Sequence, residues 1–184
     1  MKKMKKVINL MFAFTLVVWF SPKTAHAQMG EAQQVQWDVT KVADLKFDQE
    51  SMWDLLSQLD MVALYTKGYV KSVEIKGTEP QFERVLTFVD GTSRTEKFEQ
   101  IEQEHKFLAY SFAKNSLPTD IQEVSICVFT KAKGKETEVK WVAKITGKDE
   151  AKKALVAKLN AEFGKYVAGL TTVIENSVPA TVME

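Results

Sequence analysis

The chain has 184 residues, of which 25 are basic and 24 acidic, and 45% are hydrophobic. This composition lacks the excess of positive charge typical of nucleic-acid-binding proteins. Cys127 is the only cysteine, which excludes an internal disulfide, and its apolar neighbours predict a half-buried strand residue rather than a nucleophile.

The first 27 residues have the three-part pattern of a secretory signal peptide. Four lysines stand among the first six residues, an apolar run extends from Val7 to Phe20, and small residues flank His26. The run is shorter than the roughly 20 residues that span a bilayer, so we expect cleavage after Ala27 and no membrane anchor thereafter. The remaining 157 residues carry 20 basic and 24 acidic side chains, a net charge of −4. We therefore expect a periplasmic or secreted protein that does not bind nucleic acid.

The first elements of the mature chain are expected to be a strand and two short helices. Residues 28–34 are predicted to be a flexible N-terminus. Apolar residues then fall on odd positions over 35–47, which indicates a half-buried strand. Asp48 is a suitable N-cap for a helix over 51–59, and a second short helix over 60–67 would end at Gly68.

Period-two patterns predict six further strands. They cover about residues 69–77, 82–88, 93–102, 107–114, 121–131 and 139–145. Asp90-Gly91 and Lys133-Gly134-Lys135 provide hairpin turns. The segment 115–120, which contains Leu117-Pro118, is expected to connect two neighbouring strands at a rim of the sheet.

A long amphipathic helix is expected after Asp149. Its apolar stripe consists of Ala151, Leu155, Leu159, Phe163, Val167, Leu170 and Ile174. Gly164 and Gly169 lie within it and are expected to reflect close packing. Residues 35–176 thus form one domain, followed by a tail over 177–184. Because the helix must bury its stripe, we expect it to lie on the concave face of the sheet.

Several segments carry a resemblance to a known superfamily. They are Met52-Trp53-Asp54-Leu55, VKSVEIKG at 70–77, Arg84, FVDG at 88–91, RTEKFEQIEQEHKFLAYSF at 94–112, Leu117-Pro118, Trp141 and the terminal helix. In this order they resemble the helix-grip superfamily, which includes START lipid-transfer domains, the birch-pollen allergen group, abscisic acid receptors and bacterial polyketide cyclase/dehydrase-like (SRPBCC) proteins. Bacterial relatives often have a tyrosine shortly after the Leu-Pro pair, whereas this chain has the segment 119–122, TDIQ, there.

The resemblance implies an α+β helix-grip fold with a ligand cavity. A curved antiparallel sheet of about seven strands would wrap around the long C-terminal helix, with two short helices after the first strand. Such a cavity would hold a small hydrophobic molecule or a lipid. The expected wall residues are Phe82, Leu86, Tyr110, Phe112, Val124, Ile126, Val128 and Trp141 on the sheet and Phe163, Val167 and Leu170 on the helix, although the same residues could simply fill a core.

Three polar residues are expected to point into the same interior. Arg84 alternates with Phe82 on one strand, Glu96 lies in a segment similar to one that contacts ligand in abscisic acid receptors, and Tyr110 lies on an inward face. An Arg84–Glu96 ion pair would be structural, because buried charges need partners. The alternative is a polar anchor for a ligand carboxylate, hydroxyl or carbonyl group.

Catalytic signals are weak. His105 is the only histidine after the expected cleavage site and is predicted to lie exposed in a hairpin without an orienting partner. We identify no metal-ligand spacing, cofactor motif or nucleophile elbow. The leading hypothesis is therefore a non-enzymatic carrier of a hydrophobic molecule. The alternatives are a polyketide cyclase/dehydratase-like enzyme that uses the cavity's polar residues, and an export-associated interaction module whose cavity is vestigial.

Overall fold

The computed structural model describes residues 35–66, 68–78 and 81–177. The expected signal peptide, the flexible N-terminus at 28–34 and residues 178–184 of the expected tail lie outside the described residues. The strands are β1 (Val39–Leu45), β2 (Val70–Thr78), β3 (Gln81–Phe88), β4 (Ser93–Glu102), β5 (Phe107–Phe112), β6 (Ile121–Lys133) and β7 (Glu136–Gly147). The helices are α1 (Gln49–Ser57), α2 (Val62–Tyr65), α3 (Asp149–Ser177) and the short 3₁₀ turns η1 (Leu59–Met61) and η2 (Lys114–Ser116).

The strands form one antiparallel sheet in the order β1-β7-β6-β5-β4-β3-β2. From β2 to β7, strands that are consecutive in the sequence are hydrogen-bonded neighbours in the sheet. Strand β1 pairs with β7 instead of with β2. Register shifts occur in the pairings of β2 with β3, β4 with β5 and β6 with β7. Because such irregularities bend strands and increase their twist, they help the sheet to curve.

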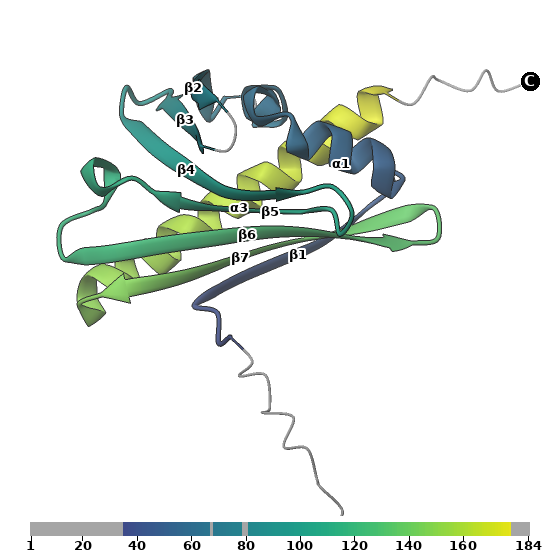
Figure 1. The fold of residues 1–184 in the computed structure, drawn as a ribbon. Coiled ribbons are helices and arrows are strands. Elements are labelled where there is room, and N and C mark those ends of the chain that lie inside the picture. Colours follow the sequence, from purple (N-terminus) through teal and green to yellow (C-terminus); the bar gives the residue numbers. More distant parts are fainter. Residues whose placement is uncertain (1–34, 67, 79–80, 178–184) are drawn as a thin grey trace, which may run out of the picture. The chain divides into compact units, whose positions relative to one another are not determined.

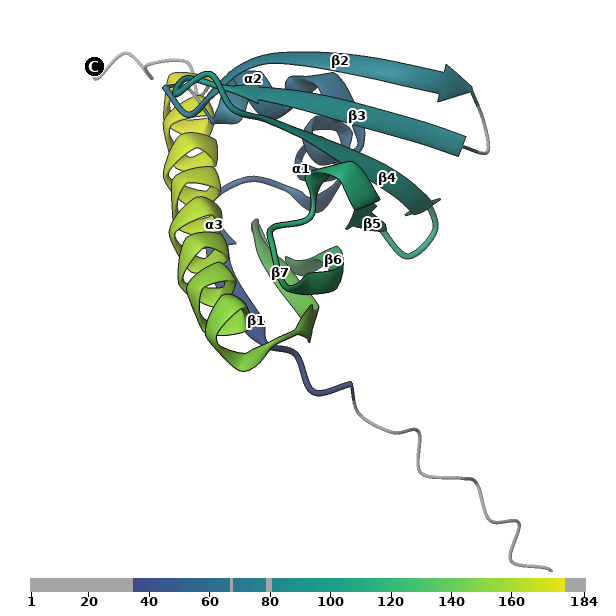
Figure 2. The ribbon, with the colours of Figure 1, turned by 90° about the vertical axis from the view of Figure 1, so that its left-hand side faces the viewer.

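Helix α3 lies along the concave side of this curved sheet, and α2 packs against it, whereas α1 packs against β6 and β7 (Figures 1 and 2). The expected apolar stripe is largely buried, from Leu155 to Ile174. Asp48 caps α1 as predicted, since its side chain accepts a hydrogen bond from the Ser51 backbone N–H at 3.0 Å. The helix-grip architecture expected from the sequence is therefore present. Within the described residues, no helix has the length and apolar character needed to cross a membrane.

The two glycines of α3 have different surroundings. A Cβ atom on Gly169 would overlap the backbone carbonyl oxygen of Tyr65, so glycine is required for α2 to pack against α3. A Cβ atom on Gly164 would have nothing within 4 Å. The expectation of close packing is therefore confirmed for Gly169 and wrong for Gly164.

Candidate functional site

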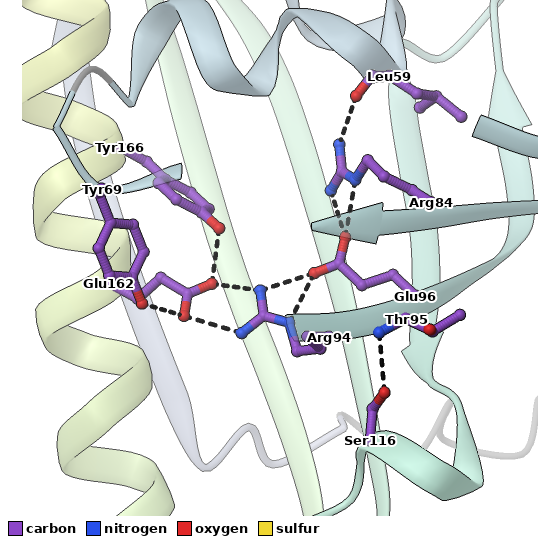
Figure 3. Close-up of polar contacts among 9 residues, drawn as sticks. All are labelled: Leu59, Tyr69, Arg84, Arg94, Thr95, Glu96, Ser116, Glu162 and Tyr166. Atoms are coloured by element: carbon purple, nitrogen blue, oxygen red, sulfur yellow. Dashed lines mark hydrogen bonds and ion pairs between the residues drawn. The ribbon is translucent and has the colours of Figure 1, made fainter. Parts of the chain in front are cut away.

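Four charged side chains meet between the sheet and α3, and we call them the ion network. Arg84 comes from β3, Arg94 and Glu96 come from β4, and Glu162 comes from α3 (Figure 3). All four are buried, and Glu96 is completely inaccessible to solvent. Two arginines and two glutamates give the network no net charge. It therefore satisfies the requirement that buried charges be paired.

Glu96 lies at the centre of the ion network because each of its carboxylate oxygens faces one arginine. Arg84 donates from Nε and Nη2 to Oε2, at 2.8 and 2.6 Å. Arg94 donates from Nε and Nη2 to Oε1, at 3.0 and 2.7 Å. The register that pairs Arg84 with Glu96 across β3 and β4 explains the first contact, and the two-residue spacing of Arg94 and Glu96 explains the second.

Glu162 connects this cluster to the helix. It accepts hydrogen bonds from Arg94 Nη1 at 2.9 Å and Nη2 at 2.5 Å. The hydroxyls of Tyr166 and Tyr69 donate to the same carboxylate at 2.6 and 2.9 Å. At the opposite end of the ion network, Arg84 Nη1 donates to the carbonyl oxygen of Leu59 at 3.2 Å. A continuous polar chain thus joins η1, two strands and α3 (Figure 3).

Aromatic rings enclose the guanidinium groups. The Cζ atom of Arg84 lies 5.0 Å from the ring centroid of Phe98 and 5.4 Å from that of Tyr110. The Cζ atom of Arg94 lies 4.4 Å from the ring centroid of Phe112. Such contacts stabilise a cation that has lost its hydration shell. The expected convergence of Arg84, Glu96 and an inward Tyr110 is therefore observed, and the Arg84–Glu96 ion pair is present.

Three groups in and beside the ion network have pKa values far from neutral. Burial would raise the pKa of Glu162, but Arg94 and the two tyrosine hydroxyls lower it to about 2. Burial opposes the charge of Arg84, yet Glu96 raises its pKa above the ordinary value. Burial also raises the pKa of Tyr110 well above the ordinary value. None of these three groups is therefore poised to exchange a proton near neutral pH, as a general acid or base would be.

The space left beside the ion network is very small. An enclosed cavity of about 10 Å³ is lined by Leu56, Tyr65, Arg84, Leu108, Tyr110, Val128, Trp141 and Tyr166. This volume is close to the minimum that one water molecule needs. The ligand-sized cavity expected at this position is thus filled by the aromatic side chains and the ion network, and an organic substrate could not contact Arg84, Glu96 and Tyr110 together without a rearrangement.

Most of the expected wall residues lie in the hydrophobic core. Those that are buried are Leu86, Tyr110, Phe112, Val124, Ile126, Val128, Trp141, Phe163 and Leu170. Phe82 and Val167 are only partly buried against this core. Phe82 is the second residue of β3, and it lines a surface groove instead.

Arg94, Glu162 and the hydroxyls of Tyr69 and Tyr166 that bind Glu162 were not predicted from the sequence. A signal for Glu162 was available, since it lies three residues after Leu159 and next to Phe163, within the buried stripe of α3. Arg94 alternates with Glu96 and therefore shares its inward face. In both cases a charged residue on an otherwise apolar face of its element indicated a buried position.

The remaining candidates lie away from the ion network. His105 is exposed in the turn between β4 and β5, as expected. Cys127 is half-buried on β6, also as expected. The segment before Pro118 forms η2, and the backbone N–H of Thr95 donates to the Ser116 hydroxyl at 2.8 Å, which ties this connection to β4. Among the described residues, no group of His, Cys, Asp and Glu has the arrangement of a metal site.

A surface groove of about 390 Å³ lies next to the Arg84 end of the ion network, and we call it the η1 groove. It is lined by Ser57, Leu59, Asp60, Ile75, Phe82, Ile101 and Gln103. Leu59 links the η1 groove to the ion network, because its carbonyl accepts the hydrogen bond from Arg84. Gln103 is held by the Trp53 indole N–H, which donates to Oε1 at 2.5 Å. The η1 groove therefore combines apolar side chains with a few polar ones, of which Gln103 is held in place.

Comparison with known proteins gives relatives in structure but not in sequence. The chain matches no protein-family profile and no curated protein. A solution structure from Thermobifida fusca has a TM-score of 0.62 at 16% identity, covering 72% of this chain and 89% of that one. The Zhui aromatase/cyclase from Streptomyces sp. R1128 has a TM-score of 0.65 at 14% identity, and the match covers 79% of this chain and 98% of that one. Norcoclaurine synthase from Thalictrum flavum, solved with dopamine and hydroxybenzaldehyde, has a TM-score of 0.60 at 18% identity. The match covers 76% of this chain and 88% of that one.

Proposed function

From the helix-grip fold of the START/SRPBCC superfamily, which this chain has, we propose that the protein is a non-catalytic binder of a small, mainly apolar molecule. The observation that carries the proposal is the η1 groove. Its volume of about 390 Å³ lies within the range of small-molecule sites, roughly 300 to 1,000 Å³. The ion network argues against catalysis, because every charge in it already has a partner.

The lining of the η1 groove suits a molecule with a large apolar part. Leu59, Ile75, Phe82 and Ile101 supply the apolar surface, and Ile75 is 39% exposed although it is a large hydrophobic residue. Covering this surface would be favourable by roughly 25 cal/mol for each Å² removed from water. A ligand that displaced Leu59 would also reach Arg84, which would then donate to a ligand carboxylate, hydroxyl or carbonyl group.

We place this activity outside the cytoplasm. The support is the pattern of residues 1–27, with its lysines, its short apolar run and its small residues before Gln28. Expression of the full chain in a bacterial host, followed by fractionation and intact mass measurement, tests this. We expect a periplasmic or secreted protein that begins at Gln28. Recovery of the uncleaved chain from the cytoplasm would contradict the proposed localisation.

The outer face of the sheet offers less support for an interaction module. Phe129 is 36% exposed there and stacks on Phe107, with ring centroids 5.6 Å apart. Val42 is also exposed on that side, but Lys140 pairs with both Val42 and Phe129 in the sheet and therefore stands between them. A charge thus interrupts the apolar surface, whereas a strong interaction patch would be continuous.

Binding of the neutral fluorescent probe N-phenyl-1-naphthylamine provides a direct test. We expect Phe82→Ser to weaken probe binding by about fivefold or more, because Phe82 supplies part of the apolar surface. Phe129→Ser is the matched control, since it removes another partly exposed phenylalanine from a strand outside the η1 groove. Equal effects of the two substitutions, or no effect of either, would contradict binding in the η1 groove.

A further inference from the structure

A second surface groove, of about 590 Å³, lies between the end of α2, the turn into β2 and the C-terminal half of α3. We call it the α3 groove. Its lining includes Leu64, Tyr69, Lys165, Ala168 and Val173. It shares no lining residue with the η1 groove. The proposed function therefore neither explains the α3 groove nor depends on it.

Small residues on α3 help to create the α3 groove. Gly169 allows the backbone of Tyr65 to approach α3 so closely that no Cβ atom would fit between them. Ala168, beside it, adds only a methyl group to the floor of the groove. On the rim, Leu64 is 52% exposed although it is a large apolar residue. The shape of the α3 groove therefore follows from close packing of α2 on α3 and not from a loose contact.

The described residues that line the α3 groove carry one positive charge and no negative charge. Lys165 is the charged residue among its described lining residues, and its Nζ atom lies 3.9 Å from the ring centroid of Tyr69. Two acidic groups face the same tyrosine, and each has a cation nearby. Glu162 is buried against Arg94, and Asp90 interacts with Lys158. The ammonium group of Lys165 is thus held at the edge of an apolar groove in which no described lining residue is acidic.

We propose that the α3 groove binds a single-chain amphiphilic anion, such as a fatty carboxylate. The carboxylate contacts the ammonium group of Lys165, and the alkyl chain lies over Ala168 and against the side chains of Leu64 and Val173. A cationic amphiphile of the same length fits the apolar surface but is repelled by Lys165. The charge preference, and not the apolar contact alone, therefore distinguishes this site.

Tyr69 couples the α3 groove to the ion network. Its ring lies under Lys165, and its hydroxyl donates to Glu162 Oε2 at 2.9 Å (Figure 3). An anion that moves the ammonium group changes the surroundings of this ring. Binding should therefore shift the aromatic NMR signals of Tyr69, assigned with the Tyr69→Phe variant, more than those of the buried Tyr110.

Calorimetric titration of the purified chain with dodecanoate and with dodecyltrimethylammonium, both below their micellar concentrations, tests the proposal. We expect dodecanoate to bind more tightly. Lys165→Gln should weaken dodecanoate binding about fivefold, near the upper end for an exposed ion pair. Lys153→Gln, which removes an exposed lysine from the first turns of α3, should leave it unchanged. Ala168→Trp, which fills the α3 groove, should abolish it.

Three results would overturn the proposal. One is the absence of dodecanoate binding at millimolar concentration. Another is equal binding of the two amphiphiles with no effect of Lys165→Gln. The third is loss of dodecanoate binding in Phe82→Ser but not in Ala168→Trp, which would place the anion in the η1 groove. Conversely, failure of N-phenyl-1-naphthylamine to respond to Phe82→Ser would contradict the proposed function and leave the α3 groove unaffected.

Discussion

Replacing Glu162 with Gln should strongly destabilise the protein although the side chain keeps its shape. The substitution removes the negative charge that Arg94 faces on the helix side. The ion network then holds two arginines and only Glu96, so one buried positive charge is left without compensation. Removing one partner of a buried ion pair typically costs about 3 to 5 kcal/mol for this reason.

The lowered pKa of Glu162 reflects the same interaction, together with burial and the two tyrosine hydroxyls. The ordinary value for a glutamate is 4.5, whereas burial, opposed by the stronger effect of Arg94 and the tyrosine hydroxyls, leaves Glu162 at about 2. The difference corresponds to about 3 kcal/mol of folding stability at pH 7. Because the folded-state pKa is depressed, this stability is fully present above about pH 4.5 and disappears as the pH falls toward 2.

Urea unfolding monitored by fluorescence of the buried Trp53 and Trp141 measures both effects. We expect the free energy of unfolding of the wild type to exceed that of Glu162→Gln by about 3 kcal/mol at pH 7 and by about 1 kcal/mol at pH 3. Glu175→Gln, which neutralises an exposed glutamate on the same helix, should cost less than about 0.5 kcal/mol at either pH. The assignment of a stabilising Arg94–Glu162 pair would be refuted if the two proteins differed little in free energy of unfolding at pH 7. It would also be refuted if that difference did not become smaller at pH 3.

A double substitution tests whether Arg94 and Glu162 stabilise the protein as a pair. Arg94→Met with Glu162→Leu removes one charge of each sign and leaves Arg84 and Glu96 as a neutral pair. The double variant should therefore be more stable than either single variant. If the two losses of stability simply add, the residues are not coupled as Figure 3 shows them.

Three further predictions follow from packing and burial. Gly169→Ala should destabilise the protein by about 1 to 3 kcal/mol, because the new methyl group overlaps the Tyr65 carbonyl, whereas Gly164→Ala should stabilise it by up to about 1 kcal/mol in the same urea assay. Burial and Glu99 raise the pKa of the Cys127 thiol, so a disulfide reagent at pH 8 should modify it faster after unfolding; equal rates would argue against a shielded thiol. All four tyrosines have raised pKa values, so absorbance at 295 nm should stay flat through pH 10 while the protein is folded and rise near pH 10 in urea; early ionisation of any tyrosine would contradict its burial or pairing.

The element order could be predicted because it depends on local periodicity. Alternation over β3 to β7 and the helical stripe of α3 require only that one face of each element be apolar. The Arg84–Glu96 pair could be predicted for the same reason, since both residues alternate with apolar neighbours. Glu162 was harder to find, because one acidic residue beside Phe163 is hidden in a long stripe unless its partner on β4 is known.

Whether the interior is open could not be predicted from the pattern. Residues that line a cavity and residues that fill a core have the same alternation, and the difference depends on side-chain packing across distant elements. Here Tyr65 from α2, Tyr110 from β5, Tyr166 from α3 and Trp141 from β7 meet around about 10 Å³. Gly169 contributes by allowing α2 to approach α3, a contact between residues 104 positions apart that no local pattern records.

The energetics of the ion network favour ligand binding at the surface. A ligand that entered between the sheet and α3 by separating Glu162 from Arg94 would break a buried ion pair, which typically costs about 3 to 5 kcal/mol. A ligand of about 20 non-hydrogen atoms gains only about 6 kcal/mol at the usual efficiency of roughly 0.3 kcal/mol per atom. Opening the interior in this way would therefore consume about half or more of the binding free energy, whereas the η1 groove is already formed. Measured affinities supply the test, because Glu162→Gln should leave N-phenyl-1-naphthylamine binding nearly unchanged if the η1 groove is the site and should strengthen it if the ligand must open the interior.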